Sequence, residues 1–134
     1  LIPQDYVEDI FLRLEIYNDI SDAKNDYDID NIVSKLEDVY GPIPDYLNNL
    51  FSLTRVKIEG NRIKADKIKI NKENTVITLN TESLIDNDKL INYFVLKSKI
   101  KLTDQFSLKY QNISKDNFSE LCDEVISMIK DISV

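Results

Sequence analysis

The chain lacks the residues from which most small active sites are built. Its 134 residues include no histidine, one cysteine and two glycines. Without histidine, neither a serine nor the thiol of Cys122 has its usual general base, and there is no cluster of cysteine and histidine to bind a metal. Two glycines are too few for a glycine-rich phosphate loop. We therefore predict no catalytic residue, no metal site and no bound cofactor, so that this chain by itself is not an enzyme.

Long apolar runs are also absent, and charged residues make up 31% of the chain. No segment approaches the roughly 20 apolar residues of a membrane-spanning helix. The opening LIPQDYVEDI has neither the basic start nor the apolar block of a signal peptide. These features predict a cytoplasmic protein with no membrane partner. Because the first residue is not methionine, we expect a piece of a longer protein.

The net charge of −7 hides an uneven distribution. Residues 1–54 carry twelve acidic and three basic side chains, whereas residues 55–115 carry seven acidic and thirteen basic ones. An acidic segment repels nucleic acid and favours a basic protein surface, while a lysine-rich segment can contact phosphates. For any single charged residue, a solvated surface position is the simpler interpretation.

Apolar residues recur at helical spacing three times in the first half and predict three amphipathic helices. The three stripes are Val7, Ile10, Phe11, Leu14 and Tyr17; Ile29, Ile32, Val33, Leu36 and Val39; and Leu47, Leu50, Phe51, Thr54 and Ile58. From residue 66 the pattern changes to alternation. Segments 66–70 and 75–79 flank the polar NKEN and predict a hairpin, and residues 99–111 predict a second strand pair.

Two further helices are predicted in the second half. One covers residues 83–97, and the other starts at Ser114 or Asp116 and continues to about residue 132. Cys122 lies on the buried stripe of the last helix, which predicts a buried free thiol. The fold class is α+β, with three N-terminal helices packed with a small antiparallel sheet of two hairpins and two further helices. We expect one domain over residues 1–134 that folds alone as a monomer.

The stretch YGPIPDYLNNL concentrates one of the two glycines and two of the three prolines of the chain. Glycine just past a helix can adopt the positive φ that closes it, and proline at a first helical position loses only an amide that has no partner. Gly41 and Pro44 are therefore predicted to end the second helix and start the third. Such a corner sets the angle between two helices.

Residues 26–37, DYDIDNIVSKLE, place oxygen-bearing side chains at the ligand spacing of an EF-hand calcium loop. Asn31 stands where the sharp turn prefers glycine, and the apolar stripe of the second helix runs through the segment. Acidic residues are also favoured at the start of a helix by its dipole. We interpret the segment as helix.

The segments LIPQDYV, RLEIYNDI and LEDVYGPIPDYLNNLFSLTRVK together resemble the C-terminal domain of the bacterial transcription-repair coupling factor, Mfd. That family carries an Ile-Pro pair before an Arg-Leu-x-x-Tyr helix, then an Asp-Arg-Phe-Gly-x-x-Pro corner and a helix with an arginine. The matching residues are Ile2, Pro3, Arg13, Leu14, Tyr17, Asp38, Gly41, Pro44 and Arg55. The resemblance is specific over residues 1 to about 63 and weaker beyond.

Two departures from the family pattern matter. Val39 and Tyr40 stand where Arg and Phe are usual, so the corner keeps its aromatic residue and lacks its basic one. The glycine that usually ends the third helix would align near Lys64, whereas this chain has Gly60. Periodicity alone would end the helix at Gly60. Following the resemblance, we expect it to run to about Ile63, although an interior glycine costs about 1 kcal/mol.

The resemblance implies a regulatory interaction domain. It implies that the domain docks on an N-terminal module that resembles UvrB. The docked domain would mask the surface of that module that recruits UvrA until the longer protein engages a stalled polymerase. ATP and magnesium would be bound by the motor domains of that protein, an ATP-dependent DNA translocase of the helicase superfamily. Other domains would contact RNA polymerase and DNA.

Candidate interface residues are Asp38 and Glu37 at the corner, together with Arg55. A carboxylate in the last turn of a helix is disfavoured by the dipole, so Asp38 requires a cation, either Arg55 or a basic residue of the partner module. Arg13 is expected to fix packing through a carboxylate inside the domain. The remaining motif residues expected to be structural are Tyr17, Gly41 and Pro44.

An alternative hypothesis is an accessory nucleic-acid-contacting domain. It rests on lysines in and around the predicted strands, namely Lys64, Lys67, Lys69, Lys72, Lys97, Lys99, Lys101 and Lys109. Lysines that alternate along a strand point to one face of the sheet and can follow a phosphate backbone. No aromatic stacking motif accompanies them.

Overall fold

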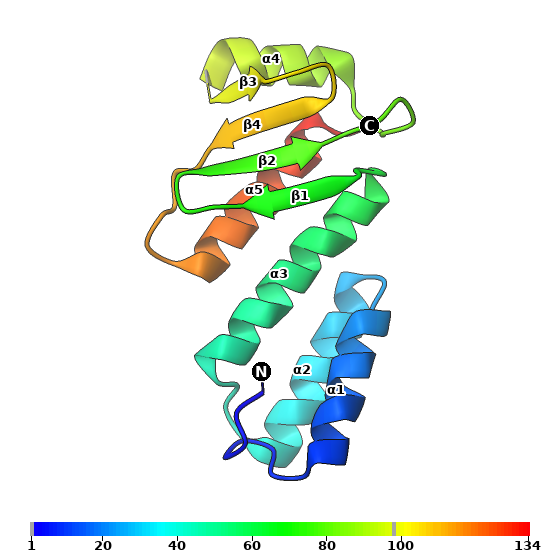
Figure 1. The fold of residues 1–134 in the computed structure, drawn as a ribbon, viewed down its shortest axis with the longest axis vertical. Helices are drawn as coiled ribbons and strands as arrows, with labels where there is room; N and C mark the ends of the chain where they lie inside the picture. Colours follow the sequence, from blue (N-terminus) through cyan, green and yellow to red (C-terminus); the bar gives the residue numbers. More distant parts are fainter. Residues whose placement is uncertain (1, 98) are drawn as a thin grey trace. The chain divides into compact units, whose positions relative to one another are not determined.

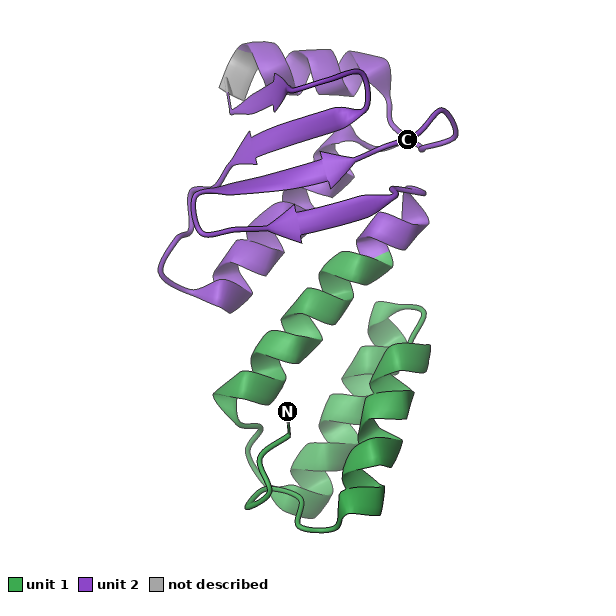
Figure 2. Cartoon of the chain, viewed as in Figure 1, with its two compact units in different colours: residues 1–58 green, residues 59–134 purple. Residues whose placement is uncertain are grey.

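The computed structural model describes residues 2–97 and 99–134. The chain divides into two compact units, unit 1 with residues 1–58 and unit 2 with residues 59–134 (Figure 2). The elements of the described residues, labelled in Figure 1, are α1 (Ile10–Asp22), α2 (Asp26–Tyr40), α3 (Asp45–Arg62), β1 (Lys67–Ile70), β2 (Asn74–Thr78), α4 (Asn87–Lys97), β3 (Ile100–Leu102), β4 (Ser107–Gln111) and α5 (Phe118–Ile132). Helices and an antiparallel sheet together confirm the predicted α+β class.

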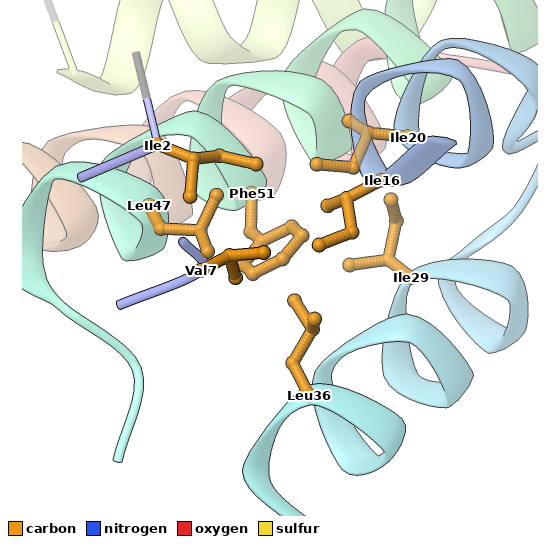
Figure 3. Close-up of a cluster of buried hydrophobic side chains, with 8 residues drawn as sticks. All are labelled: Ile2, Val7, Ile16, Ile20, Ile29, Leu36, Leu47 and Phe51. Atoms are coloured by element: carbon orange, nitrogen blue, oxygen red, sulfur yellow. The ribbon is translucent and has the colours of Figure 1, made fainter. Parts of the chain in front are cut away.

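Unit 1 is helical, and its helices enclose one apolar cluster. Figure 3 shows the eight buried side chains of this cluster, which are Ile2, Val7, Ile16, Ile20, Ile29, Leu36, Leu47 and Phe51. They come from α1, α2, α3 and the segment before α1. Tyr6, Tyr17 and Tyr40 are partly buried against them. The N-terminal segment is therefore part of the core of unit 1.

The predicted apolar stripe of the first helix is wrong. Asp9 caps α1 by accepting the N–H of Phe11 at 2.8 Å, so the helix starts at Ile10 and Val7 precedes it. The buried residues of α1 are Ile16 and Ile20. Three members of the predicted stripe are instead exposed, namely Ile10 (57%), Phe11 (77%) and Leu14 (53%). The core-facing side of α1 therefore lies elsewhere on the helix than its apolar spacing predicted.

The predicted corner between the second and third helices is confirmed. Gly41 has φ of +85°, and its N–H bonds to the carbonyl of Glu37 at 3.0 Å, which closes α2. Positive φ is costly for residues with a Cβ, so glycine is the suitable residue here. Pro44 immediately precedes α3, and its carbonyl accepts the N–H of Asn48 at 3.0 Å.

The end of α3 follows the resemblance and not the periodicity. The helix passes through Gly60 and ends at Arg62. The N–H of Ala65 bonds to the carbonyl of Gly60 at 2.9 Å, and the N–H of Lys64 bonds to that of Asn61 at 3.1 Å. This pair of bonds is a Schellman motif, in which the residue with positive φ is usually glycine. Here that residue is Lys64, with φ of +58°.

Unit 2 is built on a four-stranded antiparallel sheet with the order β1-β2-β4-β3. Its two hairpins are β1–β2 and β3–β4, joined in the centre by the pairing of β2 with β4. The inner face contributes buried residues such as Ile77, Leu108 and Tyr110. The hydroxyl of Tyr110 bonds to Glu124, and this bond places α5 against the inner face. In Figure 1, α5 lies behind the sheet.

Two predicted helix starts in unit 2 are corrected. Asp86 caps α4 by accepting the N–H of Lys89 at 3.1 Å, and Ile85 bridges Ser133, so α4 starts later than residue 83. Asn117 caps α5, whereas Ser114 or Asp116 was predicted. The stripe of α5 is confirmed, with Leu121, Cys122, Val125, Met128, Ile129 and Ile132 buried.

Candidate interaction surfaces

The corner is held by a residue that the sequence analysis did not single out. Tyr6 donates its hydroxyl to the carbonyl of Gly41 at 3.0 Å and lies within 3.4 Å of the carbonyl of Leu36. Its ring centroid is 5.6 Å from that of Tyr40. Burial raises the pKa of Tyr6, and the charge of Glu37 adds to this. The available signal was the position of Tyr6 within LIPQDYV, one of the segments that carried the resemblance.

Arg13 and Tyr17 attach the N-terminal segment to α1. Arg13 donates from Nη1 to the carbonyls of Val7 at 2.6 Å and Glu8 at 2.9 Å, so its partners are carbonyls and not the predicted carboxylate. The hydroxyl of Tyr17 accepts the N–H of Ile2. Both contacts lie inside unit 1. They tie the segment before α1 to that helix.

Arg55 and Asp38 are not brought together. The guanidinium of Arg55 lies 2.7 Å from the carboxylate of Asp30 and 3.3 Å from that of Asp26, both at the start of α2. These acids belong to the segment with EF-hand spacing, which is helical as predicted. Arg55 therefore joins α3 to the acidic start of α2 and does not pair with Asp38, for which the sequence analysis had named it as one candidate cation.

Asp38 and Glu37 are exposed at the C-terminal end of α2. Among the described residues, neither side chain forms an ion pair, and the last turn of α2 contains no basic residue. The neighbouring Val39 is 65% exposed. A charge without a partner at the unfavourable end of a helix is consistent with a cation supplied by another surface.

A small groove of about 130 Å³ lies beside this acidic end, between α1 and α2. It is lined by Leu12, Glu15, Ile16, Asp19, Lys35, Leu36, Val39 and Tyr40. Ile16 and Leu36 are buried apolar residues, while Glu15 and Asp19 are exposed carboxylates. We call Glu37, Asp38, Val39 and this groove the acidic groove. It combines an apolar lining with four carboxylates and one lysine, Lys35, so its charge is negative on balance and suits an apolar side chain flanked by basic ones.

A second hollow, of about 480 Å³, lies at the start of α1. Its lining is Ile2, Pro3, Gln4, Ile10, Arg13, Leu14 and Tyr17. Phe11, the most exposed of the apolar residues at the start of α1, is close to it in the sequence. Exposed apolar residues that lie close together are typical of surfaces that contact other proteins.

Four of the lysines named in the sequence analysis lie on the outer face of the sheet, as their alternation along the strands predicted. In the register, Lys69 pairs with Val76, Val76 with Lys109, and Lys109 with Lys101, so the three lysines occupy one row across the sheet. Lys67 lies on the same face, two residues from Lys69. We call Lys67, Lys69, Lys101 and Lys109 the lysine face. The side chain of Lys97, also in the hypothesis, lies outside the described part of the structure.

The described residues around these surfaces hold no metal-binding group and no accessible thiol. Within residues 2–97 and 99–134, no group of three or more acidic or thiol side chains is placed to hold a metal ion. Cys122 is fully buried, and burial raises the pKa of its thiol to about 11. Of the helices in these residues, none has both the length and the apolar character needed to cross a membrane.

The fold matches that of a known domain class. A crystal structure described as the C-terminal domain of transcription-repair coupling factor aligns with a TM-score of 0.73, covering 96% of this chain and 86% of that chain. Its sequence identity of 17% supports the fold alone. The family model described as the TRCF domain matches residues 1–90. The chain therefore belongs to the TRCF domain family, as the sequence resemblance indicated.

Curated relatives agree with this assignment. The transcription-repair-coupling factor of Myxococcus xanthus is 29% identical over 135 residues, covering 99% of this chain and 11% of that protein. The Haemophilus influenzae protein is 24% identical over an alignment that covers 99% of this chain and 12% of that protein. In Escherichia coli K12 the match is 29% over 77 residues, or 58% of this chain. The chain spans about a tenth of the length of the first two of these relatives.

Proposed function

We propose that this chain is a regulatory docking domain of a transcription-repair coupling factor. In this proposal it folds back on an N-terminal UvrB-like module of a longer protein and masks the surface that recruits UvrA. Other parts of that cytoplasmic protein would hold ATP and magnesium, drive translocation, and contact RNA polymerase and DNA. Membership of the TRCF domain family supports the proposed identity of the longer protein. The acidic groove supports the proposed docking.

The observation that carries the docking role is the acidic end of α2, whose two carboxylates have no ion pair in the described part of the chain. Unit 1 contains twelve acidic and five basic residues, so it repels nucleic acid and attracts a basic protein surface. The adjacent apolar lining of the groove supplies contact area that charges alone do not give. Charge complementarity speeds association and selects the partner while it adds only modest net affinity. A clamp held in this way can reopen.

The test compares two carboxylates at the ends of helices in unit 1. Asp38→Ala in the full-length protein removes the proposed contact and shifts the clamp toward the open state. A charge-assisted contact of about 1–3 kcal/mol predicts a several-fold to hundred-fold rise in UvrA capture. Asp22→Ala is the matched control, because Asp22 is the exposed last residue of α1 and lies outside the acidic groove.

Capture of UvrA by the full-length protein is measured beside thermal melts of this chain. Asp38→Ala should raise capture and leave the melting temperature equal or slightly higher, since a carboxylate leaves the negative end of a helix. Asp22→Ala should change capture little. Glu37→Ala should resemble Asp38→Ala. Unchanged capture with a destabilised Asp38→Ala chain would make Asp38 a structural residue and reject the docking surface.

A further inference from the structure

The lysine face carries a like-charge contact that folding alone does not favour. Lys101 and Lys109 are direct partners in the β3–β4 register, and both side chains are exposed. Like charges directly opposite each other in an antiparallel pair destabilise it. Among the described residues, no member of the lysine face forms an ion pair. No ion pair among the described residues therefore offsets the repulsion between Lys101 and Lys109.

Protection of the sheet edges explains only part of this arrangement. Lysines on edge strands prevent pairing with other chains, and β1 and β3 are the edges of this sheet. That accounts for Lys67, Lys69 and Lys101. It does not account for Lys109, which lies on the interior strand β4. A positive charge at that position adds repulsion without protecting an edge.

The chemistry of the outer face indicates which kind of partner it suits. Protein interfaces are enriched in aromatic residues and arginine and depleted in lysine, and binding of single strands relies on aromatic stacking. The paired outer-face positions of the strands hold Lys67, Lys69, Asn74, Val76, Thr78, Lys101, Ser107, Lys109 and Gln111. Aromatic residues and arginine are absent from this set. Lysine point charges and short polar groups suit phosphates.

The face is also hollowed where its charges are densest. A hollow of about 320 Å³ is lined by Glu73, Asn74, Lys99, Lys101, Lys109 and Gln111. Its one carboxylate, Glu73, is paired with Lys115 at 2.6 Å, and this contact lowers the pKa of Glu73. The amides of Asn74 and Gln111 can donate to phosphate oxygens beside the lysines.

We propose that the lysine face binds the phosphate backbone of duplex nucleic acid without reading its sequence. Adjacent strands lie about 4.8 Å apart, so Lys69 and Lys109, two strands apart, are separated by roughly 10 Å across the sheet. The row therefore spreads its charges over several phosphates. Four such contacts predict that log K falls against log salt with a slope of about −3 to −4, and that affinity is weak. The site uses unit 2 alone and is independent of the acidic groove.

The experiment measures fluorescence anisotropy of a labelled 20-base-pair duplex at several salt concentrations. Lys101→Glu and Lys109→Glu are the test variants, and Lys57→Glu is the control because it makes the same charge change at an exposed position in unit 1. Each test variant should weaken binding several-fold and reduce the salt slope by about 1 or more. The control should keep the slope and bind within about two-fold of the wild type.

Thermal melts separate this effect from misfolding. Each test variant replaces a like-charge pair by an opposite-charge pair, so its melting temperature should be unchanged or higher while binding falls. Equal losses of duplex affinity in the two test variants and the control would show a general effect of charge and overturn the proposed site. If the test variants bound the duplex normally but self-associated, the lysines would serve only to protect the sheet edges, and the proposed site would be rejected. Equal or tighter binding of oligo-dT or polyglutamate would reject duplex backbone as the ligand.

Discussion

The two units have opposite ways of placing charge. Unit 1 has a surplus of seven acids, whereas unit 2 has twelve acidic and twelve basic residues and is neutral overall. Yet unit 2 has the more concentrated positive surface, because four of its lysines share the outer face of the sheet while α5 carries Glu120, Asp123, Glu124 and Asp131. Net charge therefore identifies the character of unit 1 and hides that of unit 2.

The units also differ in how they use polar side chains inside. In unit 1, Tyr6 and Arg13 bond to backbone carbonyls and fasten the N-terminal segment. In unit 2, buried Asn112 accepts from the hydroxyl of Thr75 at 2.9 Å and donates to the carbonyl of Asn71 at 2.6 Å. Glu124 similarly ties α5 to the end of β4. Both units bond across long sequence distances, but in unit 2 the bonds include pairs of side chains, Thr75 with Asn112 and Tyr110 with Glu124.

The largest predicted effect contrasts the two sides of α1. Ile16→Ala should lower the free energy of unfolding by about 2–4 kcal/mol, because it removes a buried side chain from the core of unit 1. Leu14→Ala should change it by less than about 0.5 kcal/mol, since Leu14 is 53% exposed. Urea unfolding followed by circular dichroism measures both. Similar losses in the two variants would contradict the assigned core side of α1.

The next effect concerns Glu124 in unit 2. Burial would raise its pKa, but hydrogen bonds from Tyr110 and from the N–H groups of Ser114 and Ile113 outweigh burial and hold the pKa below its usual value. Glu124→Gln should lower the free energy of unfolding by about 1–3 kcal/mol at pH 7. A lowered folded-state pKa gives stability that is present above the unfolded pKa and lost as pH falls through the folded one.

The difference in free energy of unfolding between the wild type and Glu124→Gln should therefore be constant near neutral pH and shrink below about pH 4. Urea midpoints at pH 7 and pH 3 test this expectation. Glu120→Gln is a suitable control, because Glu120 is exposed on the same helix. A difference that is the same at both pH values would show that the charge of Glu124 does not support unit 2.

The smallest effect compares the two residues with positive φ. Unit 1 uses Gly41, whereas unit 2 places Lys64 in the left-handed region. Lys64→Gly should stabilise the chain by about 0.5–1 kcal/mol, because relief of roughly 1–2 kcal/mol of backbone strain exceeds the added entropy of the unfolded chain. Lys57→Gly, at an exposed position inside α3, should instead cost about 1 kcal/mol. A loss in thermal stability for Lys64→Gly would contradict this account.

Much of the fold was predictable because local signals agreed. Alternation predicted both hairpins, and the glycine and proline of the corner predicted the end of α2 and the start of α3. The core side of α1 was not predictable from spacing. Apolar residues at positions 10, 11, 12, 14, 16 and 20 surround much of this helix. The cap at Asp9 and packing against the rest of unit 1 decide which of them are buried.

Errors at helix starts have a similar cause. Ser83 and Leu84 fit a helical pattern, but Leu84 donates its N–H to the carbonyl of Ile63 and Ile85 pairs with Ser133. Contacts so distant in sequence leave no local signal. For the candidate sites, exposure of Asp38 followed from its position at the corner. The partners of Arg55 and Arg13 depended on tertiary geometry. Arg55 was one of two candidate cations for Asp38 and pairs with Asp26 and Asp30 instead, and Arg13 was wrongly expected to bond to a carboxylate.

The central pairing of β2 with β4 sets the order in which unit 2 assembles. Each hairpin closes through a short turn and can form within microseconds, whereas the pairing of Thr78 with Ser107 must wait for the segment that contains α4. During synthesis, about 30 further residues must emerge before β4 is available, which takes a few seconds at 5–20 residues per second. The edge of β2 that β4 later covers stays open in that interval.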